Sequence, residues 1–314
     1  MLRTFRINVI LLLLVGLLPP FVNAADSAPT LLVGSDRRAS IRLDGDWHYI
    51  VDPYNNGYYD FRMSPRPDGY FLNEKPGPGD KLIEYDFSRS PTLKVPGDWN
   101  SQRDSLFFYE GTIWYEKDFQ YQPKPHTRAF LHIGAANYIS HAWVNGRKAC
   151  DHEGGFTPFD CEVTNLIHAG SNFVVIYVNN QRTRDGAPTL NTDWWNYGGL
   201  TRDVSLIETP EVFIDDYSLQ LQRGDTDVIA GFVHVSGASA GTPVKVSIQA
   251  LSLNQVASTD AQGRAGFTLT PKDLQRWSPR NPKLYDVDIT AASDHVKDEI
   301  GFRTIEVQGD QILL

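Results

Sequence analysis

The sequence predicts an all-β protein built from two sandwiches, a jelly roll followed by an immunoglobulin-like domain. Helical periodicity is almost absent, whereas strand patterns are frequent. Residues 173–178 form a continuous apolar run, typical of a strand buried on both faces, and residues 244–250 and 285–289 alternate between apolar and polar side chains. The composition agrees, because 16 Phe, 14 Tyr, 25 Gly and 19 Pro favour strands and turns over helices.

The first 24 residues have the pattern of a signal peptide and not of a folded element. Arg3 and Arg6 supply a basic start, and residues 10–18 form an apolar run too short to cross a bilayer comfortably. Residues 22–24 place small side chains at −3 and −1, so cleavage is predicted before Ala25. The alternative is an uncleaved anchor. The sequence therefore predicts an exported protein, periplasmic or secreted, with no membrane segment after cleavage.

A domain boundary is predicted near Thr209 and Pro210. Six of the seven Trp residues lie before it, within residues 25–209, where long aromatic-rich loops suit a large jelly roll. Residues 210–307 show short alternating strands joined by small turns, and a length of about 100 residues suits an immunoglobulin-like sandwich. A short segment, residues 308–314, comes after the second domain.

Charge and motif content argue against several classes of function. The 29 basic and 38 acidic residues give a net charge of −9, which becomes −11 once Arg3 and Arg6 leave with the signal peptide. Such an acidic chain is not expected to bind nucleic acid or anionic membranes. The eight His residues form no metal-ligating pair, residues 44–46 and 215–216 lack calcium-loop spacing, and no nucleotide motif is present. We therefore expect no metal and no cofactor.

A serine-hydrolase motif is matched once, by the G-x-S-x-G pattern of residues 237–241. That motif requires a strand, a sharp turn and then a helix, so that the serine hydroxyl is exposed. Here small residues link two alternating strands and no helix comes after them. We interpret residues 237–241 as a flexible turn and not as a nucleophile site.

The two cysteines, Cys150 and Cys161, flank the turn-rich residues 151–160. If this segment forms a hairpin loop, the two sulfur atoms can meet across its strands, and export makes a disulfide possible. A metal site with His152 is the alternative, although two Cys and one His at this spacing do not match the usual zinc patterns. The sequence therefore predicts a Cys150–Cys161 disulfide.

One loop carries a combination of residues that suits sugar binding. Asp193, Trp194 and Trp195 are followed by an amide, a tyrosine and two glycines. Tryptophan rings stack on the C–H faces of sugars, and a neighbouring carboxylate accepts hydrogen bonds from sugar hydroxyls. The alternative is a bend that tucks both tryptophans into the core. Residues 152–159 are a second candidate loop, whose two phenylalanines we expect to cap the sandwich rather than contact a ligand.

Ordered motifs along most of the chain indicate a family. They lie at residues 95–100 (VPGDWN), 109–115 (YEGTIWY), 144–146 (VNG), 152–159 (HEGGFTPF), 198–204 (GGLTRDV), 277–285 (WSPRNPKLY) and 301–303 (GFR). Together they resemble the N-terminal domains of glycoside hydrolase family 2, which includes β-galactosidases, β-glucuronidases and β-mannosidases. The resemblance runs from about residue 39 to the end of the sequence.

The resemblance implies a galactose-binding-like jelly roll, an immunoglobulin-like sandwich and then a (β/α)8 barrel that carries the chemistry. In such families the barrel supplies an acid/base glutamate and a nucleophilic glutamate, about 5–5.5 Å apart, for hydrolysis with retention of configuration. The sequence stops at residues 308–314, which look like the lead-in to that barrel, so no catalytic residue is assigned. We expect the non-catalytic part of an exported retaining exo-β-glycosidase. Its expected partners are the missing barrel and a terminal β-linked sugar or uronic acid, and a homo-oligomer stays open.

The same resemblance assigns candidate substrate-binding residues. The loop is most similar to the β-glucuronidase pattern, and Asp193 matches the aspartate that contacts the terminal sugar. Trp194 and Trp195 either shape the pocket wall or pack. Asn196 is a further candidate, with bracing of the loop as its alternative. Glu110 lies where some galactosidases place a sugar-binding Asn, and it completes the predicted set.

Two competing hypotheses remain at the level of sequence. A free-standing carbohydrate-binding protein is the first, because a jelly roll with exposed tryptophans can bind glycans without catalysis. A truncated and inert product is the second, which the apolar residues 312–314 would suit. Binding of a polysaccharide that is lost in Trp194→Ala would favour the first of these hypotheses.

Overall fold

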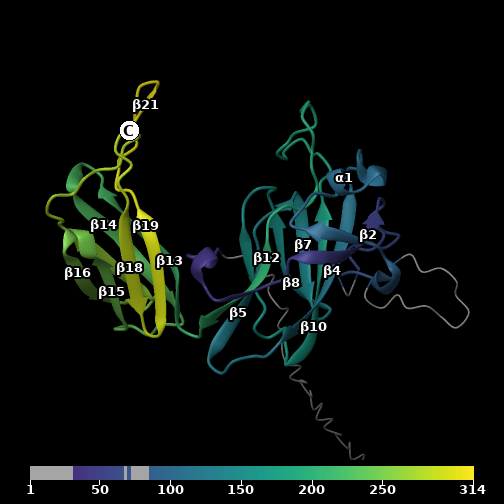
Figure 1. Ribbon diagram of the computed structural model, residues 1–314, viewed down its shortest axis with the longest axis horizontal. Coiled ribbons are helices and arrows are strands. Elements are labelled where there is room, and N and C mark those ends of the chain that lie inside the picture. Colours follow the sequence, from purple (N-terminus) through teal and green to yellow (C-terminus); the bar gives the residue numbers. More distant parts are fainter. Residues whose placement is uncertain (1–30, 67–68, 72–84) are drawn as a thin grey trace, which may run out of the picture.

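The described part of the computed structural model comprises residues 31–66, 69–71 and 85–314. The predicted signal peptide, residues 1–24, lies outside the described residues. Within them the fold is almost entirely β, with one four-residue α-helix, α1 (Trp99–Gln102), and a few short 3-10 turns. Two sandwiches lie side by side (Figure 1), which confirms the predicted fold class.

The first domain packs two antiparallel sheets face to face. The larger sheet has the order β3-β2-β4-β10-β7-β8, and the smaller one has the order β1-β12-β5-β9. Their bounds are β1 (Ser40–Arg42), β2 (Gly45–Asp52), β3 (Thr92–Val95), β4 (Thr112–Tyr121), β5 (Thr127–Ile133), β7 (Ile139–Val144), β8 (Arg147–Glu153), β9 (Phe159–Glu162), β10 (Gly170–Asn179) and β12 (Val204–Pro210). A short pair, β6 (Ala136–Asn137) and β11 (Gly199–Leu200), closes one end of the sandwich.

Strand β10 is central to the larger sheet and is buried on both faces, as its continuous apolar run predicts. Val174 and Ile176 face the core between the two sheets. Val175 and Tyr177 face outward into a second cluster. This outer aromatic cluster is formed by Ile50, Tyr70, Phe71, Tyr85, Phe87, Trp114, Trp143, Val175 and Tyr177. The larger sheet is therefore covered by apolar side chains on both sides.

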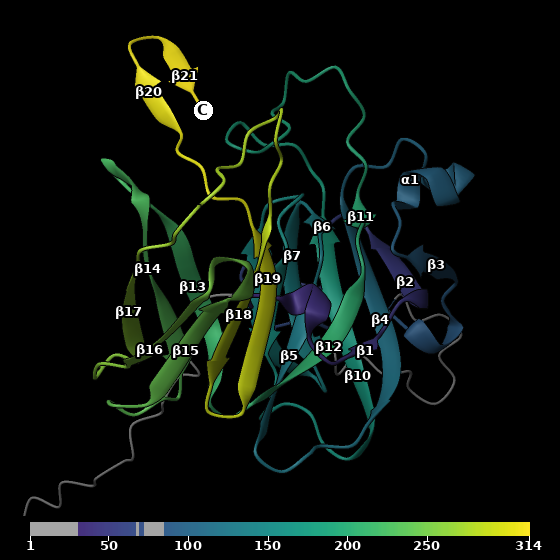
Figure 2. The same ribbon diagram turned by 60° about the vertical axis from the view of Figure 1, so that its left-hand side comes forward.

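The second domain is a smaller sandwich of three and four strands. One sheet has the order β13-β14-β17 and the other β16-β15-β18-β19. The bounds are β13 (Phe213–Gln222), β14 (Asp225–Ser236), β15 (Pro243–Ile248), β16 (Leu253–Ser258), β17 (Arg264–Leu269), β18 (Tyr285–Ala291) and β19 (Asp294–Ile300). Alternation in β15 buries Val244, Val246 and Ile248. Beyond this sandwich, β20 (Glu306–Gln308) and β21 (Gln311–Leu313) form a projecting hairpin (Figure 2).

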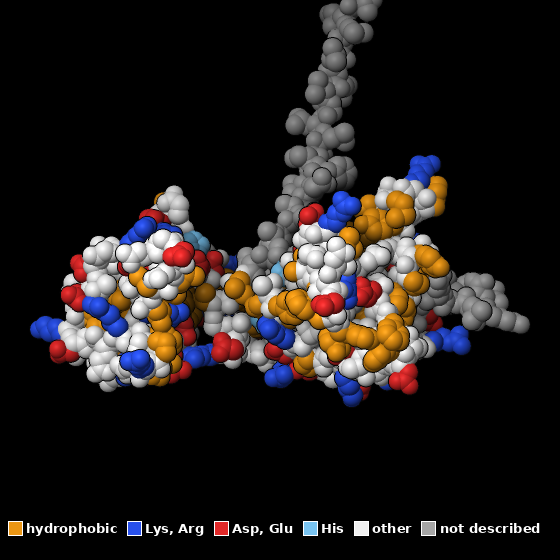
Figure 3. Space-filling view, turned by 90° about the horizontal axis from the view of Figure 1, so that it is seen from above, with side chains coloured by type: hydrophobic (Ala, Val, Ile, Leu, Met, Phe, Trp, Pro, Cys, Tyr) orange, Lys and Arg blue, Asp and Glu red, His pale blue; other side chains and the backbone are white. Residues whose placement is uncertain are grey.

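Residues 31–38 connect the two domains. Arg38 donates two hydrogen bonds of 3.0 and 3.1 Å to the carboxylate of Asp294 in the second domain, and both side chains are less than 10 % exposed. At the other end of the segment, the backbone N–H of Leu32 donates to Asp160 of the first domain. Leu32 also packs with Phe130, Ile207 and Phe213 in a small apolar cluster. Figure 3 shows the two domains as separate lobes.

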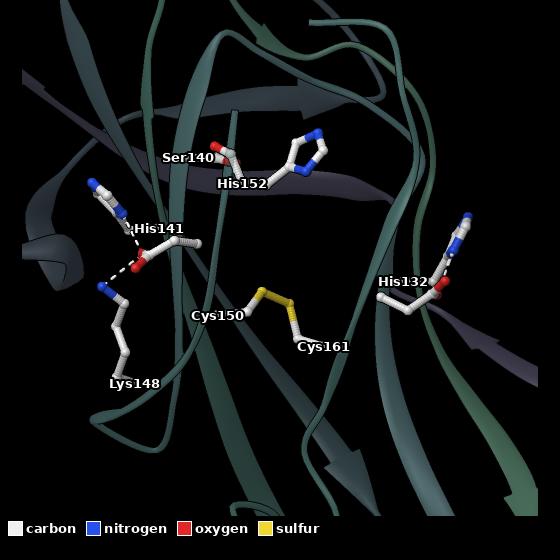
Figure 4. Close-up of a disulfide and its surroundings, with 9 residues drawn as sticks. His132, Ser140, His141, Lys148, Cys150, His152 and Cys161 are labelled. Atoms are coloured by element: carbon white, nitrogen blue, oxygen red, sulfur yellow. Dashed lines mark hydrogen bonds and ion pairs between the residues drawn. A yellow bond between two sulfur atoms is a disulfide. The ribbon is translucent and has the colours of Figure 1, made fainter. Parts of the chain in front are cut away.

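Cys150 and Cys161 are joined by a disulfide, with their Cα atoms 5.7 Å apart (Figure 4). The segment between them, however, is not the hairpin that the sequence suggested. Cys150 lies on β8 and Cys161 on β9, and these strands belong to different sheets. The connection crosses from one sheet to the other, so the disulfide ties the two sheets of the first domain together. Of the two phenylalanines in this loop, Phe159 is buried and Phe156 is exposed, so only Phe159 caps the core.

Candidate functional site

A hollow of about 190 Å³ opens at the end of the first domain where the predicted loop projects. Two segments far apart in sequence form it, the connection from α1 to β4 and the loop between β10 and β11. In Figure 1 this loop rises above β7. The lining residues are Asn100, Phe108, Glu110, Arg182, Thr192, Asp193, Trp194, Trp195 and Asn196. All four predicted substrate-binding residues, Glu110, Asp193, Trp194 and Asn196, are therefore brought to one place.

Asp193 is exposed in this hollow and its carboxylate is available to a ligand. Within the residues that the structure describes, it forms no hydrogen bond and no ion pair. Most other acids in this domain have partners, such as Asp52 with the indole N–H of Trp114 and Asp160 with His132. A free carboxylate at a concave surface can accept hydrogen bonds from ligand hydroxyl groups.

Arg182 fixes the backbone on both sides of Asp193. Its guanidinium donates to the carbonyl oxygen of Thr192 and, at 3.1 Å, to that of Trp194. The same group forms an ion pair with Glu110, with N–O distances of 3.0 and 3.1 Å. Because the planar guanidinium holds three partners at once, it limits the freedom of the loop that presents Asp193.

The ion pair also determines the charge of the hollow. Glu110 balances the charge of Arg182, so the carboxylate of Asp193 gives this wall a net negative charge. Such a wall suits hydroxyl donors and disfavours a ligand carboxylate. Glu110 lines the hollow as predicted, but its carboxylate already has a partner in Arg182.

Both ends of the Asn196 side-chain amide have hydrogen-bond partners inside the protein. Its side-chain oxygen accepts from the Nδ2 of Asn137 at 3.0 Å, and its nitrogen donates to the carbonyl of Asn180. In return, Asn180 Nδ2 donates to the Asn196 carbonyl at 2.8 Å. Asn196 is 4 % exposed, so these contacts favour its role as a brace of the loop over direct sugar binding.

The base of the loop is anchored to the α1 region. Asn100 Oδ1 accepts from the N–H of Gly198 at 3.0 Å, and its Nδ2 donates to the carbonyls of Leu106 and Tyr109. Gly198 lies against the buried ring of Trp99, where a Cβ would come within 2.0 Å of a ring atom. Only glycine permits this close approach, which explains why the loop returns to β11 at this residue.

The two tryptophans differ in their surroundings. Trp194 is 68 % exposed, whereas Trp195 is 37 % exposed and packs against Phe107 and Phe108, with ring centroids 4.7 and 5.4 Å apart. Neither ring enters the core, so the predicted alternative of a core bend is wrong. Phe107 and Phe108 were not predicted as site residues, although two adjacent aromatics before Tyr109 were a visible signal.

Two features are absent from the residues that the structure describes. No group of three or more His, Cys, Asp or Glu side chains lies close enough to hold a metal ion in this part of the chain. Among the same residues, no helix has the length and apolar character needed to cross a membrane.

Comparison with family models identifies the class. The architecture is that of a sugar-binding domain followed by an immunoglobulin-like domain. The model described as "Glycosyl hydrolases family 2, sugar binding domain" matches residues 41–210, which is more than half of the 314 residues. The model "Glycosyl hydrolases family 2" matches residues 212–303. The chain belongs to glycosyl hydrolases family 2, which confirms the resemblance seen in its motifs.

Within the family, the curated relatives that match this chain include β-glucuronidases. The chain is 27% identical over 304 residues to a β-glucuronidase of Paenibacillus borealis, covering 87% of this chain and 46% of the relative. It is 28% identical over 266 residues to the human β-glucuronidase, covering 71% of this chain and 40% of the relative. The chain thus spans less than half the length of these two curated relatives.

Solved structures agree on the fold. A β-glucuronidase of Bifidobacterium dentium, complexed with coumarin-3-O-glucuronide, matches with a TM-score of 0.70 at 23% identity, covering 88% of this chain and 50% of that one. A β-glucuronidase from an uncultured Clostridium sp. matches with a TM-score of 0.67 at 26% identity, covering 90% of this chain and 48% of that one. In both, the likeness extends across the two β-sandwiches.

Proposed function

We propose that this chain is the non-catalytic N-terminal part of an exported, retaining exo-β-glycosidase of the β-glucuronidase type. Membership of glycosyl hydrolases family 2 supports the reaction class, hydrolysis of terminal β-glycosidic bonds. The β-glucuronidase relatives favour a terminal uronic acid over galactose. Export is supported by the pattern of residues 1–24 and is compatible with the Cys150–Cys161 disulfide, because disulfides persist in oxidising compartments.

The observation that carries this proposal is Asp193, a free carboxylate held in a hollow by the backbone clamp of Arg182. In the proposed enzyme this wall binds the terminal sugar through its hydroxyl groups. The net negative charge of the wall opposes a uronate carboxylate, so we expect that carboxylate to lie on the opposite side, toward a separate catalytic domain.

Hydrolysis itself needs groups that this hollow does not offer. A retaining mechanism uses one carboxylic acid as acid/base and a second carboxylate as nucleophile. Of the two acids that line the hollow, Glu110 is paired with Arg182, which leaves Asp193 alone. We propose that a (β/α)8 barrel, as expected for the family, supplies both catalytic groups and is the principal partner of this chain.

The first test measures sugar binding by the purified 314-residue chain. Binding of methyl β-D-glucuronide is followed by saturation-transfer NMR for the wild type, Asp193→Asn and Asp185→Asn. Asp185 is exposed in the same loop, so its variant is matched in charge and position. We expect Asp193→Asn to weaken binding roughly tenfold, as for loss of a charge-assisted hydrogen bond, and Asp185→Asn to leave it unchanged. Equal effects of the two variants would contradict the role of Asp193.

The second test measures turnover. The same chain is incubated with aryl β-glucuronide and aryl β-galactoside, and the released aryl group is compared with a protein-free blank. We expect no turnover above the blank, because the hollow offers one free carboxylate. Turnover well above the blank would overturn the assignment of this chain as non-catalytic.

A free-standing carbohydrate-binding protein is the second candidate function. The exposed aromatic rings beside the hollow favour it, because such rings bind glycans without catalysis. The coding sequence downstream of Leu314 distinguishes the two candidates. A reading frame that continues into a barrel supports the enzyme, and a stop codon combined with glycan binding supports the binding protein.

A further inference from the structure

We propose that Phe107, Phe108 and Trp195 form an aromatic shelf that binds the C–H face of a second pyranose ring, next to the terminal sugar contacted by Asp193. This inference rests on the proposed function and names its substrate class as β-linked oligosaccharides rather than isolated monosaccharide conjugates. The three rings come from two segments, the connection before β4 and the loop between β10 and β11.

The three rings of the shelf pack against one another. Phe107 and Phe108 pack edge to face at 4.9 Å, and Trp195 contacts both rings at 4.7 and 5.4 Å. The segment that carries the phenylalanines is fixed below by Asn100, which binds the carbonyls of Leu106 and Phe107. The rings are therefore held in place before any ligand arrives, which lowers the entropic cost of binding.

The exposure of the shelf leaves its rings accessible to a ligand. Phe108 is 82 % exposed, and Phe107 and Trp195 are 47 % and 37 % exposed. Single exposed aromatics are common on proteins and need no explanation, as for Phe61, which contacts only the neighbouring Arg62 among the aromatic and cation contacts described. Several adjacent rings at the edge of a polar hollow form an apolar patch of the kind that marks a binding surface. Figure 3, which views the molecule from above relative to Figure 1, shows hydrophobic side chains at the surface of the lobe of the first domain.

The chemistry of the neighbouring groups selects a carbohydrate as the occupant. Phe108 and Trp195 line the same hollow as Asp193 and the Glu110–Arg182 pair. A pyranose ring has hydroxyl groups at its edge and an apolar C–H face, so a carboxylate and an aromatic surface side by side match both.

The size of the hollow places the second ring on the shelf. Its volume is about 190 Å³, below the range of about 300–1,000 Å³ typical of sites for drug-sized ligands. A hollow of this size takes a single terminal ring. The next ring of the sugar chain then lies at the edge of the hollow that Phe108 and Trp195 line, over the exposed faces of these two rings.

The experiment compares two ligands on the purified 314-residue chain. Methyl β-D-glucuronide probes the hollow alone, and a disaccharide with β-D-glucuronic acid linked to glucose probes the hollow and the shelf. Dissociation constants are measured by saturation-transfer NMR for the wild type, Trp195→Ala, Phe108→Ala and Phe61→Ala. Phe61 is an exposed phenylalanine outside the hollow and serves as the matched control.

We expect the wild type to bind the disaccharide about three- to tenfold more tightly than the methyl glycoside, the gain expected for one stacked ring. Trp195→Ala and Phe108→Ala should abolish this preference because they weaken binding of the disaccharide more than binding of the methyl glycoside, whereas Phe61→Ala should leave both unchanged. Because Phe108 is 82 % exposed, its variant should fold normally even if Trp195→Ala does not. Circular dichroism checks this.

Failure of the shelf and failure of the proposed function give different results. If Asp193→Asn weakens both ligands but Trp195→Ala and Phe108→Ala keep the disaccharide preference, the shelf is wrong and the sugar wall stands. If Trp195→Ala removes the preference while Asp193→Asn changes nothing, the shelf stands and the wall is wrong. Absence of any binding by the wild type overturns both.

Two other occupants are tested in parallel. The first is an aryl leaving group. If Phe108→Ala and Trp195→Ala weaken binding of 4-nitrophenyl β-D-glucuronide but not of the disaccharide, the shelf binds the aryl group and the pyranose assignment is wrong. If sedimentation shows a dimer that Phe108→Ala dissociates, the shelf is an interface between copies of this chain, and the proposal is also overturned.

Discussion

Different kinds of side chain fill the cores of the two sandwiches. In the first domain Trp47, Trp99, Trp114 and Trp143 are fully buried, and an aromatic cluster covers the outer face of the larger sheet. In the second domain Val, Ile and Leu of alternating strands predominate in the core. Aromatic rings fill large, irregular spaces, whereas branched aliphatic side chains suit the narrow gap of a small sandwich.

The two domains also differ in their connections, which are mostly short in the second domain apart from residues 270–284 between β17 and β18. In the second domain β13 and β14 are joined by residues 223–224, and β18 and β19 by residues 292–293. In the first domain β10 and β11 are joined by residues 180–198, which hold Asp193 and most of the hollow. The first domain therefore holds a long loop in place over the hollow, and the second domain is a more compact sandwich. Substitutions in each domain test this contrast.

The largest expected effect is in the aromatic core. Trp114→Ala removes a fully buried ring that packs near Phe71, Trp143 and Tyr177 and donates to Asp52, so it should cost about 3–5 kcal/mol. The measurement is urea unfolding followed by tryptophan fluorescence, which reports mainly on the first domain because six of the seven Trp lie there.

The matched substitution in the second domain is Ile289→Ala, at a fully buried position of β18. This substitution should lower the free energy of unfolding by about 2–5 kcal/mol. The loss should appear in the unfolding transition followed by far-ultraviolet circular dichroism, and the transition followed by fluorescence should shift less. Coincident shifts of both transitions in both variants would mean that the domains unfold as one unit, and the contrast between them would then not extend to stability.

The second prediction concerns the link between the domains. Asp294→Ala leaves the guanidinium of Arg38 buried without its carboxylate, and should cost about 3–5 kcal/mol in urea unfolding. Asp288→Ala is the control, because Asp288 pairs with His295 at the surface, where such pairs contribute at most about 1 kcal/mol. A similar loss in both variants would argue against the buried pair as the main tie between the sandwiches.

The third prediction concerns the disulfide, which the structure forms only in the first domain. Replacing Cys150 and Cys161 by Ala together should cost about 2–3 kcal/mol, because the closed loop is short and the bond limits the unfolded chain. The fluorescence transition should shift, and a reducing agent should destabilise the wild type but not the variant. A variant as stable as the wild type would show that sheet packing alone holds β8 and β9 together.

The smallest expected effect is a dependence on pH. Burial lowers the pKa of His132, but its hydrogen bond to Asp160 and the charges of Asp160 and Asp203 outweigh burial and raise that pKa above its ordinary value of 6.5. Figure 4 shows the hydrogen bond that His132 makes. Because the folded state raises the pKa, protonation of His132 stabilises the fold. This contribution is present below pH 6.5 and is lost as the pH rises through the pKa of the folded state.

His132→Gln should accordingly flatten the decline in stability above pH 6.5, as followed by thermal unfolding at several pH values. His126→Gln is the control, since His126 is exposed and pairs with Glu211 at the surface. If the slope against pH is the same in His132→Gln and the wild type, another group is responsible for the decline.

Much of the fold could be predicted from the sequence. The apolar run of β10 and the alternation of β15 and β18 follow directly from the period of a strand, because side chains two residues apart share a face. The family motifs indicated both sandwiches and their order. The place of Asp193 in a loop with aromatic neighbours could also be read from the sequence, whereas its contact with a sugar stays a prediction.

The sequence by itself determined the strand pattern, the family and the residue types of the candidate loop. Only the tertiary structure decided which of them meet. Phe107 and Phe108 join Trp195, and Glu110 pairs with Arg182, across separations of more than 70 residues. The disulfide links two sheets rather than one hairpin. Local patterns indicate which face of a strand is buried. Long-range contacts depend instead on how the two sheets pack, and this packing cannot be read from the pattern of a single sequence.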